Sequence, residues 1–170
     1  DPWVRQMADK TQARVLFYGC TEEADLQAGE IQSHGLDGIS CTLTWQGQTH
    51  EICSPLLGEF SVYTILRAVA VALSEGLDWE TITDELRASQ NSLRMKQMTL
   101  PNGVTIIDDT YNAAPESTVA ALALLAELPG RRVAILGDML ELGPYEQTGH
   151  EAVGKAAAEA AEALILIGER

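Results

Sequence analysis

The chain has 170 residues, 46% hydrophobic and 5% aromatic, which is enough to bury one core or two small ones. Asp and Glu number 25 against 11 Lys and Arg, and a formal net charge of −14 repels phosphate backbones and anionic lipid headgroups, so neither a nucleic-acid partner nor membrane insertion is expected. No apolar run approaches the roughly 18 residues that a membrane-spanning helix needs, and the polar opening segment DPWVRQMADK lacks the apolar centre of a signal peptide.

The first part of the chain predicts a short helix, a strand and an antiparallel meander. Residues 3–11 have the pattern of a short amphipathic helix, and residues 13–19 form a β-branched and aromatic run typical of a strand. Residues 25–53 alternate apolar and polar residues over three short runs, the last two separated by Gln46-Gly47 at hairpin distance. We therefore expect a meander with one face in water.

Two helices are predicted after the meander. Residues 61–76 are Ala-rich, mostly apolar and end at a Gly, which predicts a buried helix. Asp78 is a suitable N-cap for a second helix over residues 79–88.

The polar stretch SQNS, residues 89–92, is the strongest linker candidate in the chain. We place a domain boundary at 88–92 and expect one domain at 1–88 and another at 89–170.

The second part alternates strands and helices. Asn102-Gly103 predicts a hairpin turn between residues 94–100 and 104–109. Three predicted strands then alternate with two predicted helices, in the order 104–109, 117–128, 131–138, 151–162 and 163–168. This order with short connections predicts an α/β fold, with a parallel sheet and right-handed crossovers.

Acidic residues follow the carboxyl ends of these strands, where ligands bind in such sheets. Asp108 and Asp109 leave the first strand, and Asp138 follows the second. By alternation one of the neighbouring Asp side chains faces the crevice, where a carboxylate can accept bonds from ribose hydroxyls or sit behind a Mg²⁺ ion. The alternative is that these are ordinary turn and N-cap residues before a helix, and the residues alone leave both open.

Several other common sites are absent from the sequence. There is no G-x-x-x-x-G-K-[ST] or G-x-G-x-x-G motif, so no glycine-rich loop cradles a triphosphate here. Cys20, Cys41 and Cys53 form no CxxC pair or zinc-finger spacing, which fits a reducing cytoplasm.

Three segments resemble the ATP-dependent Mur ligases of peptidoglycan synthesis. They are Asn102-Gly103 with TIIDDTYNAAPES (105–117), LPGRRVAILGDMLELG (128–143), and His150 with Val153-Gly154. The loop DDTYNAAP is similar to the family's DDSYNANP, which differs from the loops of sister ligases and indicates the branch that adds D-alanyl-D-alanine. The resemblance covers essentially the whole chain.

The resemblance implies how the two domains are related to a longer protein. Residues 1–88 would be the C-terminal part of a central ATP-binding domain, an antiparallel meander plus helices. Residues 89–170 would be most of a Rossmann-like C-terminal ligase domain. The phosphate-binding loop and the magnesium-binding segments would precede Asp1, so the chain alone is expected to be inactive.

The implied activity is ligation of an acid to an amine. ATP phosphorylates the carboxylate of a UDP-N-acetylmuramoyl tripeptide, and the amine of D-alanyl-D-alanine attacks the acyl phosphate, with Mg²⁺ ligands expected outside this chain. The parent protein would be cytoplasmic and monomeric. Two alternatives remain: a Mur-type amide ligase with a different amine substrate, and a non-catalytic ligase-like subunit.

The resemblance also assigns residue roles. Asp109 would contact the ribose of ATP, Arg94 a nucleotide phosphate, and Ser61 and Thr64 the adenine region. The crevice where the dipeptide enters would be lined by Tyr111, Asn112, Asp138, Glu141 and His150.

The chain departs from the family pattern in three segments. Phe60, Ser61 and Thr64 stand where the family has His-Asn-x-x-Asn, which predicts altered adenine binding. Leu93 replaces a glycine before Arg94, and Ala114 replaces the second Asn of the DDSYNANP loop.

Overall fold

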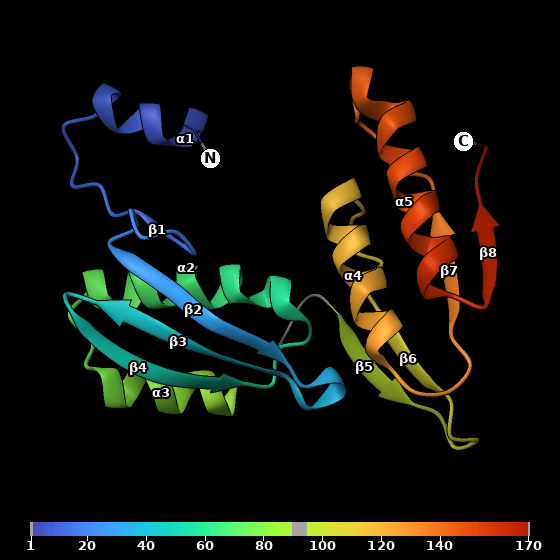
Figure 1. Cartoon of the computed structure of the whole chain (residues 1–170), viewed down its shortest axis with the longest axis horizontal. Coiled ribbons are helices and arrows are strands. Elements are labelled where there is room, and N and C mark those ends of the chain that lie inside the picture. Colours follow the sequence, from blue (N-terminus) through green and yellow to red (C-terminus); the bar gives the residue numbers. More distant parts are fainter. Residues whose placement is uncertain (1, 90–94, 170) are drawn as a thin grey trace.

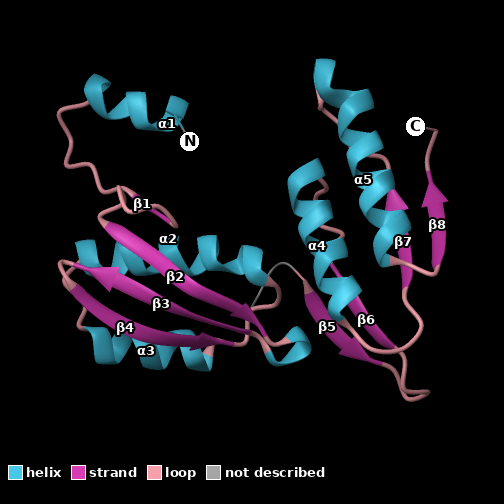
Figure 2. Cartoon of the chain, viewed as in Figure 1, coloured by secondary structure: helices cyan, strands magenta, loops and turns pink. Residues whose placement is uncertain are grey.

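The computed structural model describes residues 2–89 and 95–169, and Figure 1 shows two groups of elements, one before residue 90 and one after residue 94. The first group comprises α1 (Pro2–Met7), β1 (Tyr18–Gly19), β2 (Leu26–Ser33), β3 (Ile39–Trp45), β4 (Gln48–Ser54), α2 (Val62–Ser74) and α3 (Trp79–Ala88). The second comprises β5 (Lys96–Thr99), β6 (Thr105–Asp108), α4 (Pro115–Glu127), β7 (Val133–Gly137), α5 (Glu146–Ala160) and β8 (Ala163–Ile167). The mixed α/β class predicted from the sequence is confirmed (Figure 2).

The predicted meander is present as the antiparallel strands β2, β3 and β4. Gln46 and Gly47 join β3 to β4 with φ values of 50° and 78°, the left-handed pair that a tight two-residue hairpin requires. Leu26, Leu43 and Ile52 point to the same face and are at most 1% exposed. They pack against α2 and α3, while the opposite face carries polar residues and is partly open to water.

Helices α2 and α3 form where their local signals place them. In α2, Ile65, Leu66 and Val69 recur at helical spacing and are at most 1% exposed. Asp78 caps α3: its Oδ1 accepts the Thr81 N–H at 2.8 Å and its Oδ2 accepts the Thr81 hydroxyl at 3.0 Å. These bonds hold the pKa of Asp78 below its ordinary value.

The strand predicted over residues 13–19 is mostly wrong, because only Tyr18 and Gly19 pair, in parallel, with β2. Asp25 closes this short ladder, since its carboxylate accepts the Phe17 N–H at 2.8 Å and its own N–H donates to the Phe17 carbonyl. A β-branched and aromatic run becomes a strand only where a neighbouring edge supplies hydrogen-bond partners.

In the second group, β5 and β6 form the predicted hairpin. Strands β7 and β8, which α5 connects, pair in parallel. Helices α4 and α5 pack together against one face of β7. The buried cluster between them comprises Leu122, Ala134, Met139, Val153, Ala157 and Ala160. This cluster is separate from the one under the meander, although the domain boundary at 88–92 stays a prediction because residues 90–94 lie outside the described part.

Three predicted parallel strands do not form one ladder. Within residues 95–169, β6 pairs with β5 alone and β7 with β8 alone. The hairpin supplies β6 with an antiparallel neighbour, and the outward face of the β7–β8 pair stays open: Ile135, Ile165 and Ile167 are 63%, 50% and 63% exposed.

Two helices begin earlier than predicted. Helix α4 begins at Pro115, because proline at the first helical position loses no needed donor. Helix α5 begins at Glu146 after the turn Gly143–Tyr145, and its polar first turn carries no apolar periodicity that sequence reasoning could detect. No helix in the described ranges is both long and apolar enough to cross a membrane.

The core under the meander predicts a clear contrast between two α2 positions. Leu66 is 0% exposed, so Leu66→Ala should lower the free energy of unfolding by about 2–5 kcal/mol through lost burial and a cavity. Val71 is 64% exposed on the same helix, so Val71→Ala should change it by less than about 0.5 kcal/mol. Urea denaturation measures both, and equal losses would contradict this packing.

Candidate functional site

Asp108 and Asp109, at the end of β6, accept hydrogen bonds from different parts of the chain. Asp108 Oδ1 accepts the Thr110 hydroxyl at 2.7 Å and the Thr110 N–H at 3.0 Å, so this side chain shapes its own turn. Those two bonds lower the pKa of Asp108. The stability it contributes is therefore present above the ordinary carboxyl pKa and is lost as the pH falls through the lowered one.

Asp109 reaches outside its own loop. Its Oδ1 accepts the Met95 N–H at 3.3 Å, and the side chain is half-buried. Met95 has a φ of 50°, an uncommon value for a residue with a side chain. Asp109 thus ties the end of β6 to the chain that enters β5, and its second oxygen offers a further acceptor.

Met95 also adjoins the first group of elements. A Cβ placed on Gly58 would lie 3.9 Å from Met95 Sδ and 3.8 Å from Leu124 Cβ. Gly58, which precedes the short turn Glu59–Ser61 leading into α2, therefore lies near the same residue that Asp109 holds, and the turn itself contacts α4. The structure brings the predicted Ser61 and Asp109 regions to one seam between the two groups.

The predicted adenine-region residues lie at the start of α2, Ser61 at the end of the preceding turn and Thr64 in the first turn of the helix. Ser61 donates its hydroxyl to the Leu57 carbonyl, and Thr64 is exposed. Phe60 and Tyr63 place their ring centroids 5.4 Å apart, with Phe60 49% exposed. This tilted pair offers an aromatic surface beside Thr64.

Sequence reasoning missed Tyr63 and Arg67 at this surface. Arg67 reaches Thr64 Oγ1 at 3.5 Å and the Tyr63 carbonyl at 3.3 Å. The spacing of residues 60, 63, 64 and 67 already places them on one helical face, which was the available signal. Arg94, the predicted phosphate contact, lies outside the described residues.

The loop after β7 is tied to the end of β8. Asp138 Oδ2 accepts the Glu169 N–H at 3.0 Å, across the carboxyl ends of the two parallel strands. Gly168 has a φ of 135°, and a Cβ there would overlap the Asp138 carboxylate. The predicted substrate residue Asp138 therefore also has a structural partner.

His150 bridges the same loop to α5. Its Nε2 accepts the Met139 N–H at 3.1 Å, and its Nδ1 donates to the Glu146 carbonyl at 2.8 Å. Glu146 and His150, one helical turn apart on α5, thus meet through the Glu146 backbone.

The loops after β6 and β7 meet at the start of α5. A Cβ on Gly149 would lie 2.7 Å from Pro115 Cγ and 3.1 Å from Leu142 Cδ1, so both loops press on this helix. The predicted residues Tyr111, Asn112 and Glu141 are exposed at this end, Tyr111 by 81%.

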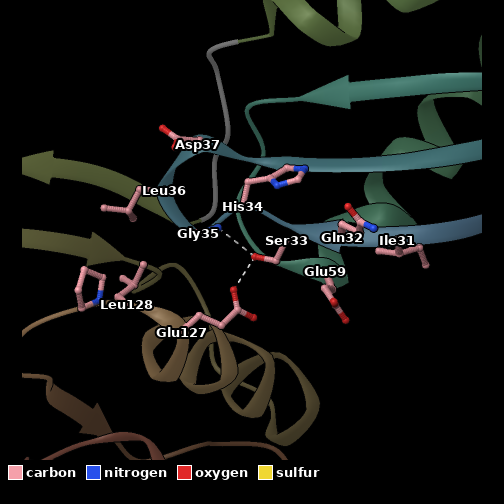
Figure 3. A pocket seen from close by; sticks show the side chains of 11 residues that line it. Ile31, Gln32, Ser33, His34, Gly35, Leu36, Asp37, Glu59, Glu127 and Leu128 are labelled. Carbon is pink, nitrogen blue, oxygen red and sulfur yellow. Dashed lines mark hydrogen bonds between the residues drawn. The ribbon is translucent and has the colours of Figure 1, made fainter.

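A cleft with a volume of about 690 Å³ lies elsewhere in the described part of the chain (Figure 3). Residues 31–37, Glu59 and the end of α4 line it, and the residues predicted for a ligand do not. Ser33 Oγ accepts the Gly35 N–H at 3.3 Å and donates to Glu127 Oε2 at 2.6 Å, so the cleft is a second seam between the two groups.

The described part of the chain contains neither a metal-ligand cluster nor a disulfide. Within residues 2–89 and 95–169, no three His, Cys, Asp or Glu side chains group closely enough to hold a metal ion. The three cysteines are free, and burial, then the neighbouring Cys53 and Cys20, raises the pKa of Cys41 to about 11.

Comparison with protein families decides the identity of the chain. Residues 1–72 match the Mur ligase middle domain, and residues 93–170 match the Mur ligase, glutamate ligase domain. The chain belongs to the Mur ligase family.

Several curated relatives of the chain are named UDP-N-acetylmuramoyl-tripeptide–D-alanyl-D-alanine ligase. The Synechocystis sp. protein is 35% identical over 151 residues, which is 84% of this chain and 30% of that protein. The Mycobacterium tuberculosis H37Rv protein is 35% identical over 165 residues, 92% of this chain and 32% of that one. The chain thus spans about a third of the length of the curated relatives it matches.

Solved Mur ligase structures share the fold. MurF from Acinetobacter baumannii superposes with a TM-score of 0.79 at 28% identity, covering 99% of this chain and 36% of that one. MurF from Thermotoga maritima, in complex with ADP, gives a TM-score of 0.76 at 22% identity over 99% of this chain and 42% of that one, which shows the fold alone.

Alanine substitutions at Gly168 and Gly154 should change the free energy of unfolding in opposite directions. Gly168→Ala forces a strained backbone and displaces Asp138, so the free energy of unfolding should fall by about 1–3 kcal/mol. Gly154 lies in α5, and an added methyl group there would meet no atom within 4 Å, so Gly154→Ala should raise it by about 0.5–1 kcal/mol. Denaturant unfolding of both variants measures this, and a stabilised Gly168 variant would contradict the Asp138 contact.

Proposed function

We propose that this Mur ligase chain is part of an ATP-dependent ligase that joins D-alanyl-D-alanine to a UDP-N-acetylmuramoyl tripeptide in peptidoglycan synthesis. The observation that carries the proposal is the 35% identity, over 84% and 92% of the chain, to relatives of that name. Because the match runs through both groups of elements, it supports one activity for the whole protein rather than a borrowed domain.

The nucleotide would lie at the seam beside Asp109. A half-buried carboxylate with one oxygen on Met95 and one further acceptor suits a ribose hydroxyl. The exposed Phe60–Tyr63 pair suits stacking on adenine, and Thr64 and Ser61 present hydroxyls beside it. A phosphate contact from Arg94 completes this proposal.

ATP supplies the phosphoryl group that makes the substrate carboxylate a good electrophile. The residues of this chain would bind and orient the nucleoside and exclude water as the two groups close on it. The described residues offer no ligand cluster for Mg²⁺, so we assign the metal no contact here.

The amine would enter at the loops after β6 and β7. Tyr111 and Asn112 are exposed on the first loop, and Glu141 on the second. The ammonium group of an incoming dipeptide favours carboxylates such as Glu141 and Asp138. The parent protein would act in the cytoplasm as a monomer, on the UDP-linked peptide and the dipeptide.

Ligation by the whole protein that contains this chain tests the proposal. We expect ATP-dependent coupling of D-alanyl-D-alanine to the UDP-linked tripeptide, measured by chromatography of the product. A panel of single amino acids and other dipeptides is the control. Preference for another amine would support a different Mur-type ligase, and a protein that couples none would support the non-catalytic alternative.

Asp109→Ala should weaken the binding of ATP to that protein. A charged acceptor bonded to hydroxyls contributes about 1.5–3 kcal/mol, so the KM for ATP should rise about tenfold to a hundredfold. Asp108→Ala is the matched control, because Asp108 bonds only to Thr110 among the contacts that the structure gives it. Steady-state kinetics measures both, and a larger ATP effect from Asp108 would reverse the assignment.

A further inference from the structure

The two hydrogen bonds of His150 identify its acceptor nitrogen and its donor nitrogen. The Met139 N–H can only donate, so Nε2 must carry a lone pair toward it. The proton of the neutral ring is then on Nδ1, where it points to the Glu146 carbonyl. Both ring nitrogens are satisfied only by this neutral tautomer.

The bond to His150 supplies an acceptor to a backbone N–H at a buried position. Its side chain is 2% exposed in the cluster under α4 and α5, and Thr118 Oγ1 lies 3.9 Å from its Sδ. A backbone donor beside so buried a side chain has little access to water, so it needs a protein acceptor. The acceptor comes from His150, eleven residues further along the chain.

The two residues after Met139 form an exposed arc, Leu140–Glu141. Leu140 is 62% exposed, and Glu141 has a φ of 64°, which costs free energy for a residue with a Cβ. Such a conformation persists only where its neighbours fix it. The buried Met139 precedes the arc, and the half-buried Leu142, packed on the same cluster, follows it.

We infer that His150 is a positioning residue for the amine substrate. By accepting the Met139 N–H, His150 fixes the orientation of the peptide unit between residues 138 and 139, just before the arc. It thereby holds the Glu141 carboxylate where an ammonium group can reach it. His150 itself need not touch the substrate. This inference rests on the proposed function, since it takes the amine to enter beside this arc.

Two variants distinguish the role of the Nε2 acceptor from that of the other atoms of the His150 ring. A glutamine side chain carries its amide oxygen about as far out as Nε2, so His150→Gln can still accept the Met139 N–H. An asparagine amide ends near the position of Nδ1, so His150→Asn keeps only the bond to Glu146. Lys155→Ala, at an exposed position of the same helix, is the control.

The experiment uses the whole ligase and whichever amine the wild type couples best. We expect the KM for the amine to rise about threefold to tenfold in His150→Asn, the effect of one lost hydrogen bond. The KM for ATP and kcat should stay within about twofold, and His150→Gln should lie closer to wild type than His150→Asn. Hydrogen exchange followed by mass spectrometry should show faster exchange of residues 138–142 in the Asn variant than in the Gln variant.

The outcomes are distinguishable. Equal effects of the Gln and Asn variants on both readouts would show that the ring only fills space, and would overturn the inference. An unchanged amine KM in His150→Asn would overturn it as well. A wild-type protein that couples no amine would overturn the proposed function, and this inference with it.

Discussion

Backbone N–H groups at the ends of strands need acceptors once the sheet no longer supplies them, and this need shapes the candidate site. Asp109 accepts the N–H of Met95, Asp138 that of Glu169, and His150 that of Met139. Each acceptor comes from a different element than its donor. The rim of the second group is therefore held by the same polar side chains that the family resemblance assigns to ligands.

Because each of these side chains already accepts a backbone N–H, only its remaining hydrogen-bonding capacity is available to a ligand. A carboxylate has several lone pairs, so Asp109 and Asp138 can hold a backbone donor and still accept another bond. The imidazole of His150 has one acceptor and one donor, and both are already engaged. For that reason the carboxylates remain suited to direct contact, and the histidine is suited to support.

Local chemistry explains which parts of the fold the sequence predicts well. The left-handed turn at Gln46-Gly47 and the cap at Asp78 act within a few residues, and the meander and α3 follow them closely. Residues 13–19 have strand propensity but depend on a distant edge for partners, so most of the predicted strand fails. The separation of β6 from β7 also depends on pairing that no local pattern encodes.

The site is harder to predict for the same reason. The motif marks Asp109, Asp138 and His150, but their partners lie 14, 31 and 11 residues away. No spacing rule reveals such contacts. Tyr63 and Arg67 differ, since helical periodicity alone would have found them.

The open face of the β7–β8 pair sets how the isolated 170-residue chain should behave in solution. Parallel strands are normally covered on both faces, yet Ile135, Ile165 and Ile167 are half-exposed or more. The net charge of −14 keeps copies apart at low ionic strength. At about 0.1 M salt the Debye length shrinks to about 10 Å, so the repulsion fades while the attraction between aliphatic faces remains. Colloidal stability of the chain is thus a balance between charge and an aliphatic surface, and added salt shifts it toward self-association.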